Sequence, residues 1–92
     1  MTESVSCVRF QVSGRVQGVG FRYAAMQEAT RIGVSGWVKN LSNGDVELVV
    51  CSDDQQLAQL ESWLQQGPRF AQVSKVEREP SSELVVGEFE IR

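Results

Sequence analysis

The sequence predicts an α+β domain in which two helices cover one face of a mostly antiparallel sheet of four or five strands. Two segments show the helical spacing of apolar residues, and the segments around them alternate apolar and polar residues as strands do. The pair Asn43-Gly44, a strong hairpin signal, stands between two of the predicted strands. With 92 residues, 41% of them hydrophobic, the chain is expected to form one domain, residues 1–92, around one core.

The first strand and the first helix follow from the spacing of apolar side chains. Residues 8–12 alternate between apolar and polar types, which predicts a half-buried strand. Residues 21–32 predict a helix, because apolar side chains recur at Phe21, Ala25, Ala29 and Ile32. We expect Gly33 to end this helix, since glycine adopts the left-handed conformation without strain.

The middle of the chain predicts a hairpin followed by a second helix. Residues 36–41 and 45–51 are expected as strands on either side of the Asn43-Gly44 turn. Ser52 and Gln55 have the spacing of a capping box, which would open the second helix. The apolar stripe of this helix consists of Leu57, Leu60 and Leu64, with Trp63 beside it, and Gly67-Pro68 is expected to end it.

The last third of the chain predicts two further strands. Residues 71–79 form the fourth, and the break in alternation between Val73 and Val76 indicates a bulge. Residues 89–92 are expected to add a short fifth. The order strand, helix, strand, strand, helix, strand is the split βαβ, or ferredoxin-like, arrangement. A right-handed crossover makes its first two strands parallel, so their C-terminal ends lie at the same edge of the sheet.

A glycine-rich segment, Gly14 to Arg22, connects the first strand to the first helix. Three glycines in seven residues let the backbone curl until several N–H groups point at one place, where an anion such as phosphate fits. Arg22 stands in the first helical turn, where a cation opposes the helix dipole by roughly 0.3–1 kcal/mol unless an anion lies between them. Judged by spacing alone, a plain glycine-rich connection with a surface arginine explains the segment equally well.

Asn40 is the second candidate site residue. It stands near the C-terminal end of the second strand, at the edge where the glycine segment leaves the first strand. The topology therefore brings Arg22 and Asn40 toward each other across one crevice, at the edge where βα units commonly bind ligands. Asn40 could instead simply start the hairpin turn, which is a frequent role of asparagine.

The residue inventory excludes several kinds of catalysis. The chain has no histidine, and no phosphate cradle follows Cys51, so imidazole and phosphatase-thiolate mechanisms do not fit. The carboxylate pairs at 45 and 47 and at 53 and 54 are expected to be solvated charges or caps, and no metal site is expected. Arg22, loop N–H groups and an amide can bind a phosphoryl group and position water. An acyl phosphate suits that set, because its carboxylate leaving group has a pKa near that of Glu, roughly 4.3, and needs no general acid.

Two segments of the chain resemble the signatures of the acylphosphatases. Residues 12–22, Val-Ser-Gly-Arg-Val-Gln-Gly-Val-Gly-Phe-Arg, look like the first signature. Residues 36–40, Gly-Trp-Val-Lys-Asn, followed by Gly44 and Val46, look like the second. The resemblance covers essentially the whole chain. It implies the ferredoxin-like fold and hydrolysis of a small acyl phosphate to a carboxylate and inorganic phosphate, without metal or cofactor.

The resemblance also implies roles for single residues. Arg22 would bind the phosphoryl oxygens and Asn40 would orient the attacking water. The phosphate-binding loop would consist of Arg15, Val16, Gln17, Gly18, Val19 and Gly20. One position departs from the family pattern, because Ser52 stands where the second signature usually continues to a glycine. Ser52 lies away from the expected site, and the capping box offers a reason for the serine.

Two other functions fit parts of the sequence. A binding module would keep the fold and the anion pocket without turnover, and a turnover assay separates it from an enzyme. A nucleic-acid binder would need basic and aromatic residues on an open sheet face, where Trp37 is the one stacking candidate. The formal net charge of −3, without a block of like charges, argues against nucleic-acid and membrane partners. Trp63 and Tyr23 are expected to be helix-packing or surface aromatics.

The cellular location of the protein bears on whether its two cysteines form a disulfide. The segment 1–6 is short and polar for a signal peptide, so a cytoplasmic protein is expected. A monomer is the default expectation for the oligomeric state. Cys7 and Cys51 fall at adjoining ends of the antiparallel first and third strands, both on the face away from the helices. A disulfide between them is expected in the oxidised protein, at the end of the sheet opposite the glycine segment. A reducing compartment would instead favour two free thiols.

Overall fold

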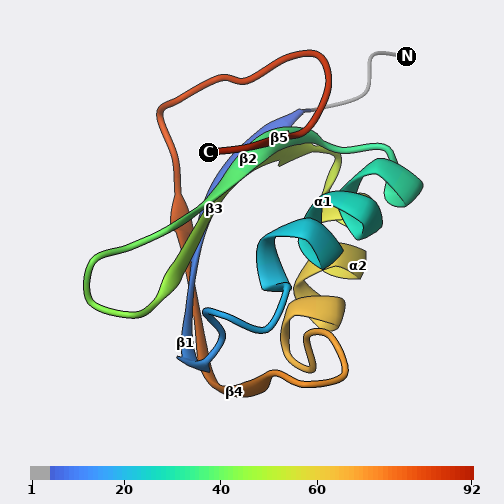
Figure 1. The fold of residues 1–92 in the computed structure, drawn as a ribbon. Helices are drawn as coiled ribbons and strands as arrows, with labels where there is room; N and C mark the ends of the chain where they lie inside the picture. Colours follow the sequence, from blue (N-terminus) through green and yellow to red (C-terminus); the bar gives the residue numbers. More distant parts are fainter. Residues whose placement is uncertain (1–4) are drawn as a thin grey trace.

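The computed structural model describes residues 5–92, which fold into a five-stranded sheet with two helices on one face (Figure 1). Residues 1–4, part of the segment compared with a signal peptide, lie outside the described residues. The elements are β1 (Ser6–Arg15), α1 (Phe21–Ile32), β2 (Ser35–Asn40), β3 (Val46–Ser52), α2 (Asp54–Leu64), β4 (Gln72–Pro80) and β5 (Glu90–Ile91). The predicted α+β, ferredoxin-like order is confirmed.

The first two strands of the sheet are parallel, as the right-handed crossover between them predicts. The order is β4-β1-β3-β2-β5, and β3 runs antiparallel to both β1 and β2. Strands β1 and β2 are therefore parallel, and their C-terminal ends share one edge of the sheet. The short β5 pairs in parallel with β2. Pairing with β5 brings the last residues of the chain to the same strand that carries Asn40.

The core lies between the helices and the sheet. Phe10 of β1 faces Leu48 of β3 in the antiparallel register, and both side chains are fully buried. The predicted apolar stripe of α2 is buried over them, as are Phe21, Ala25 and Ala29 of α1. Burying each leucine or phenylalanine contributes roughly 1.5–3 kcal/mol. The ring of Trp63 packs on Phe21 with the ring centroids 5.7 Å apart, so Trp63 is a helix-packing residue as expected.

The predicted bulge lies in β4 where that strand pairs with β1. Ser13 pairs with Lys75 and Gly14 with Val73, so Ser74 is the extra residue. Gly14 has a φ of 123°, and a Cβ built on it would lie 2.2 Å from the carbonyl oxygen of Gln72. Glycine is therefore required by both backbone conformation and close approach, directly before the loop that leaves β1.

The predicted capping box is wrong by one residue. The residue that caps α2 is Asp53, whose carboxylate accepts a hydrogen bond from the backbone N–H of Gln56 at 2.8 Å. Ser52 stays in β3 opposite Ser6, is only 7% exposed, and hydrogen-bonds the side chain of Gln56. The carboxylate is the better cap, because it is charged and complements the positive helix end. Helix α2 also ends at Leu64, three residues before the predicted glycine.

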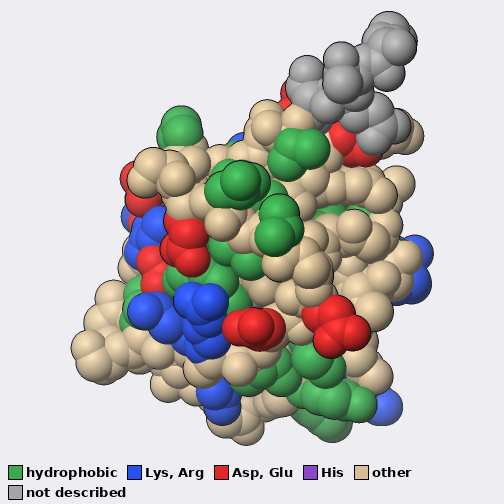
Figure 2. Space-filling model, turned by 90° about the horizontal axis from the view of Figure 1, so that it is seen from above, with side chains coloured by type: hydrophobic (Ala, Val, Ile, Leu, Met, Phe, Trp, Pro, Cys, Tyr) green, Lys and Arg blue, Asp and Glu red, His purple; other side chains and the backbone are tan. Residues whose placement is uncertain are grey.

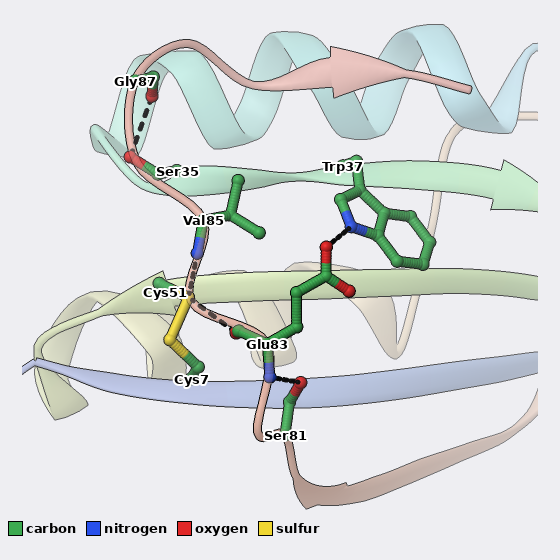
Figure 3. Close-up of a disulfide and its surroundings, with 8 residues drawn as sticks. All are labelled: Cys7, Ser35, Trp37, Cys51, Ser81, Glu83, Val85 and Gly87. Carbon is green, nitrogen blue, oxygen red and sulfur yellow. Dashed lines mark hydrogen bonds between the residues drawn. A yellow bond between two sulfur atoms is a disulfide. The ribbon is translucent and has the colours of Figure 1, made fainter.

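A segment without regular structure, residues 81–89, crosses the face of the sheet opposite the helices (Figure 3). Its Glu83 accepts a hydrogen bond from the indole N–H of Trp37 at 3.0 Å, and Gly87 accepts one from Ser35 at 2.8 Å. Trp37 is consequently only 5% exposed. The open aromatic face that a nucleic-acid binder would need is therefore covered.

The disulfide between Cys7 and Cys51 is present and joins directly opposite residues of β1 and β3. It lies on the face away from the helices, under residues 81–89, where the N–H of Val85 donates to the Cys51 sulfur at 3.4 Å (Figure 3). This confirms the predicted pairing and strand register. In the part of the chain that the structure describes, no helix is long and apolar enough to cross a membrane.

Candidate active site

The loop between β1 and α1 leaves the N-terminal end of α1, which is the positive end of the helix dipole, accessible to solvent. Gly18 and Gly20 both have a φ of 75°, and Gly20 is the left-handed residue before the helix. Within residues 5–92, no side chain caps this end, and the first turn holds no acidic residue. The first N–H groups of the helix are thus left for an anion, which the helix dipole also favours.

Arg22 stands in the first turn of α1, beside those N–H groups. Its side chain is partly buried, and its Nη1 donates a hydrogen bond of 3.1 Å to the main-chain oxygen of Arg92. This contact ties the guanidinium to the segment that follows β5. A guanidinium held at one of its nitrogens keeps the others free for a planar, bidentate partner such as phosphate.

Asn40 is the last residue of β2 and is exposed. It opposes Val46 in the β2–β3 ladder, just before the hairpin turn. In the part of the chain that the structure describes, no hydrogen bond is assigned to its side-chain amide, so this group is free to meet a ligand or water. Asn40 thus stands at the start of the hairpin connection, as one of the two interpretations of the sequence expects.

One cavity of about 210 Å³ brings the two candidate residues together. Arg22 lines it from the helix and Asn40 from the strand, as the parallel arrangement of β1 and β2 predicts. Gly18 and Gly20 lie on the loop side. The remaining lining residues are Val16, Phe21, Tyr23 and Ile91. A single hollow therefore combines a cation, exposed backbone and an amide.

The predicted loop residues do not all line this cavity. Val16, Gly18 and Gly20 do, whereas Arg15, Gln17 and Val19 are not among its lining residues. Arg15 is the last residue of β1 and is exposed, and Val19 packs against the core. The amide nitrogen of Gln17 donates to the carbonyl oxygens of Leu41 and Asp45, at 2.8 Å each. The Gln17 side chain thus fastens the loop to the β2–β3 turn.

Three lining residues, Phe21, Tyr23 and Ile91, are not predicted as site residues by the sequence. The helical spacing predicts Phe21 only as an apolar residue of the helix, and its side chain is 2% exposed. Tyr23 is a surface aromatic as expected, 58% exposed, but it also borders the cavity. The available signal was its position directly after Arg22 in the first helical turn. Ile91 is 40% exposed and reaches the cavity because β5 pairs with β2. Nothing in the local sequence indicates that pairing.

Most other basic side chains of the sheet form ion pairs with carboxylates that do not line this cavity. Arg9 pairs with Glu47 and, at 3.0 Å, with Glu79, while Lys39 lies 3.6 Å from Glu47. The hydrogen bond that the Arg9 guanidinium donates to the Glu47 carboxylate is the main reason why the pKa of Arg9 is raised. On the face seen in Figure 2, basic and acidic side chains likewise lie next to each other. Residues 5–92 contain no group of three or more acidic or cysteine side chains placed to hold a metal ion.

Comparisons with known proteins show the family of this chain. A family model described as acylphosphatase matches residues 8–91. An acylphosphatase from Vibrio cholerae is 51% identical over 78 residues, or 85% of each chain. The structure of an acylphosphatase from Coxiella burnetii superposes with a TM-score of 0.91 at 42% identity, covering 96% of this chain and 93% of that one. An acylphosphatase from Bacillus subtilis gives a TM-score of 0.89 at 33% identity, covering 97% and 99%. The chain therefore belongs to the acylphosphatase family.

Proposed function

We propose that this cavity is where the chain hydrolyses acyl phosphates, with Arg22 and the loop holding the phosphoryl group and Asn40 orienting the attacking water. The observation that carries the proposal is the convergence of Gly18, Gly20, Arg22 and Asn40 on one cavity. The membership in the acylphosphatase family, which acts on small acyl phosphates, supports it independently.

Binding of the phosphoryl group rests on charge and backbone donors together. The phosphoryl oxygens accept from the N–H groups of the first turn of α1 and of the loop residues that line the cavity, Val16, Gly18 and Gly20. The helix end contributes about half a positive charge. Arg22 adds a full charge and a bidentate fork. Because both are fixed before the substrate arrives, no reorganisation is needed when charge develops in the transition state.

Attack and departure need little further help from the protein. The Asn40 amide accepts a hydrogen bond from water and directs the water oxygen at phosphorus. The new P–O bond forms as the bond to the acyl oxygen breaks, and the carboxylate leaves with the electron pair. One proton of the attacking water passes to a phosphoryl oxygen, so the second product is dihydrogen phosphate. A loose phosphoryl-transfer transition state asks mainly for positioning, and the carboxylate is stable without a proton.

The proposal also covers the need for a cofactor, the cellular location and the oligomeric state. Arg22 and the helix end supply the positive charge, so the scheme routes no step through a metal or a cofactor. We propose that the chain acts as a single, monomeric domain, because this one chain supplies every residue described as lining the cavity. We also propose a cytoplasmic location, since small charged phosphates do not pass a bilayer freely.

A steady-state assay tests the proposal. Release of inorganic phosphate from acetyl phosphate is measured beside a phosphate monoester, with and without a chelator. We expect turnover of acetyl phosphate only, at the same rate with chelator. Phosphate binding without turnover would support the binding module instead, and equal hydrolysis of the monoester would contradict the assignment to acyl phosphates.

A further inference from the structure

Tyr23 and Ile91 form an apolar border on the cavity that holds Arg22. They line the same 210 Å³ cavity as Gly18, Gly20 and Arg22, from α1 on one side and β5 on the other. Both side chains are exposed to solvent, at 58% and 40%. Exposed apolar surface beside a polar cradle is a common way to bind a two-part ligand.

The charges around the cavity restrict what can lie against this border. Among the described residues that line the cavity, Arg22 is the single charged one. The nearby Arg92 directs its guanidinium elsewhere, 3.5 Å from Glu90, 3.9 Å from Glu83 and 4.9 Å from the ring centre of Trp37. A second anionic group on the substrate would thus find no unengaged cation lining the cavity.

We infer that Tyr23 and Ile91 bind the acyl group of the substrate and favour apolar acyl groups, aromatic ones above all, over acyl groups that carry a second negative charge. The inference rests on the function proposed above, because it assumes that the phosphoryl group occupies the glycine-lined part of the cavity with Arg22. The acyl group attached to it must then lie along the remaining lining. Apart from Asn40, which the proposed function assigns to the water, that lining is apolar or aromatic and consists of Val16, Phe21, Tyr23 and Ile91. Contact with these side chains removes apolar surface from water on both partners.

Three acyl phosphates with the same phosphoryl group measure the preference. We expect kcat/KM to fall in the order benzoyl, acetyl, succinyl phosphate. In Tyr23→Ala, the ratio of kcat/KM for benzoyl phosphate to that for acetyl phosphate should fall about tenfold, the scale of one lost apolar contact. Tyr23→Phe keeps the ring and should keep the ratio. Leu84→Ala removes an apolar side chain that is 70% exposed and does not line the cavity, so it serves as the matched control.

Binding without turnover provides a second readout. Phenylphosphonate and methylphosphonate carry the same anionic group and differ in the apolar part. Calorimetry should show tighter binding of phenylphosphonate to the wild type, and Tyr23→Ala and Ile91→Ala should each reduce that preference. An unchanged preference in Tyr23→Ala, by either measurement, would overturn the inference while leaving the hydrolytic function intact. If no acyl phosphate were hydrolysed while phenylphosphonate still bound more tightly than methylphosphonate, the proposed function alone would be overturned.

Discussion

The side-chain amide of Gln17 donates a hydrogen bond of 2.8 Å to the carbonyl oxygen of Leu41, the residue that directly follows Asn40. A second bond of 2.8 Å reaches the carbonyl of Asp45. The glycine loop is thereby fixed to the strand end that carries Asn40. This side chain adds to the pairing of β1 and β2 with β3 in fixing the relative position of the two halves of the site.

Replacing Gln17 by Ala should therefore loosen the loop from the hairpin. Two hydrogen bonds are lost, although each carbonyl oxygen keeps a backbone N–H donor, from Gly44 at 3.2 Å and from Leu41 at 2.8 Å. At roughly 0.5–1.5 kcal/mol for each bond, we expect the free energy of unfolding to fall by about 1–3 kcal/mol. The value of kcat should fall several-fold, because the distance between water and phosphoryl group is no longer fixed. Kinetics and thermal melts of Gln17→Ala, beside Gln59→Ala on the exposed face of α2, provide the test. Equal values of kcat and of the melting temperature in the two variants would contradict a positioning role of Gln17.

Gly14 should tolerate no side chain. Alanine at this position combines a φ of 123° with a Cβ 2.2 Å from the Gln72 carbonyl oxygen. We expect Gly14→Ala to lower the free energy of unfolding by about 2–5 kcal/mol, the sum of backbone strain and displacement of β4. Gly44→Ala is the matched control, because φ is 97° there but a Cβ would meet no atom within 4 Å. Chemical denaturation compares them, and an equal loss in both variants would contradict the close-approach argument.

The disulfide should stabilise the fold without taking part in hydrolysis. Its cysteines are 44 residues apart, and closing a loop of that length is worth about 4 kcal/mol in the chain-entropy model. We expect reduction to lower the melting temperature and to leave the room-temperature rate within about twofold, because neither cysteine lines the cavity. Free-thiol counts before and after reduction establish the redox state. Two titratable thiols in the air-oxidised native protein would contradict the register of β1 and β3.

The parts of the fold that the sequence predicts best depend on local patterns. Alternation in β1 and the leucine spacing of α2 each report which face is buried, and Asn43-Gly44 reports the hairpin between β2 and β3. The crossover rule then places Arg22 near Asn40 without further information. The helix cap was misplaced because Ser52 and Asp53 are both good caps, and the ladder with Ser6, a long-range contact, decides between them.

The features that the sequence does not predict depend on contacts between distant segments. Residues 81–89 have no period, so nothing indicated that Glu83 would cover Trp37. The hydrogen bonds of Gln17 and the approach of Ile91 depend on elements that meet only after folding. Within the site, glycine spacing and a first-turn arginine were informative because they conflict with an ordinary helix start.

Asn40 should act mainly in the transition state. We expect Asn40→Ala to lower kcat strongly and to change KM little, because orienting water does not bind the ground state. Asn40→Asp should be no better, since it places a negative charge near an anionic substrate. Steady-state kinetics beside a thermal melt distinguish the roles. Loss of substrate affinity with an unchanged kcat would make Asn40 a binding residue.

The most direct test of the account is hydrolysis of acetyl phosphate by folded Arg22→Ala. Arg22 is the single charged residue among those described at the cavity, so its removal should cost roughly 3–4 kcal/mol of transition-state stabilisation, or a factor of several hundred in kcat/KM. Arg22→Lys should also fail, because a point charge does not reproduce the bidentate fork. Competitive inhibition by inorganic phosphate should weaken in parallel. Near-normal kcat/KM in an Arg22→Ala protein whose melting curve matches the wild type would contradict the central claim.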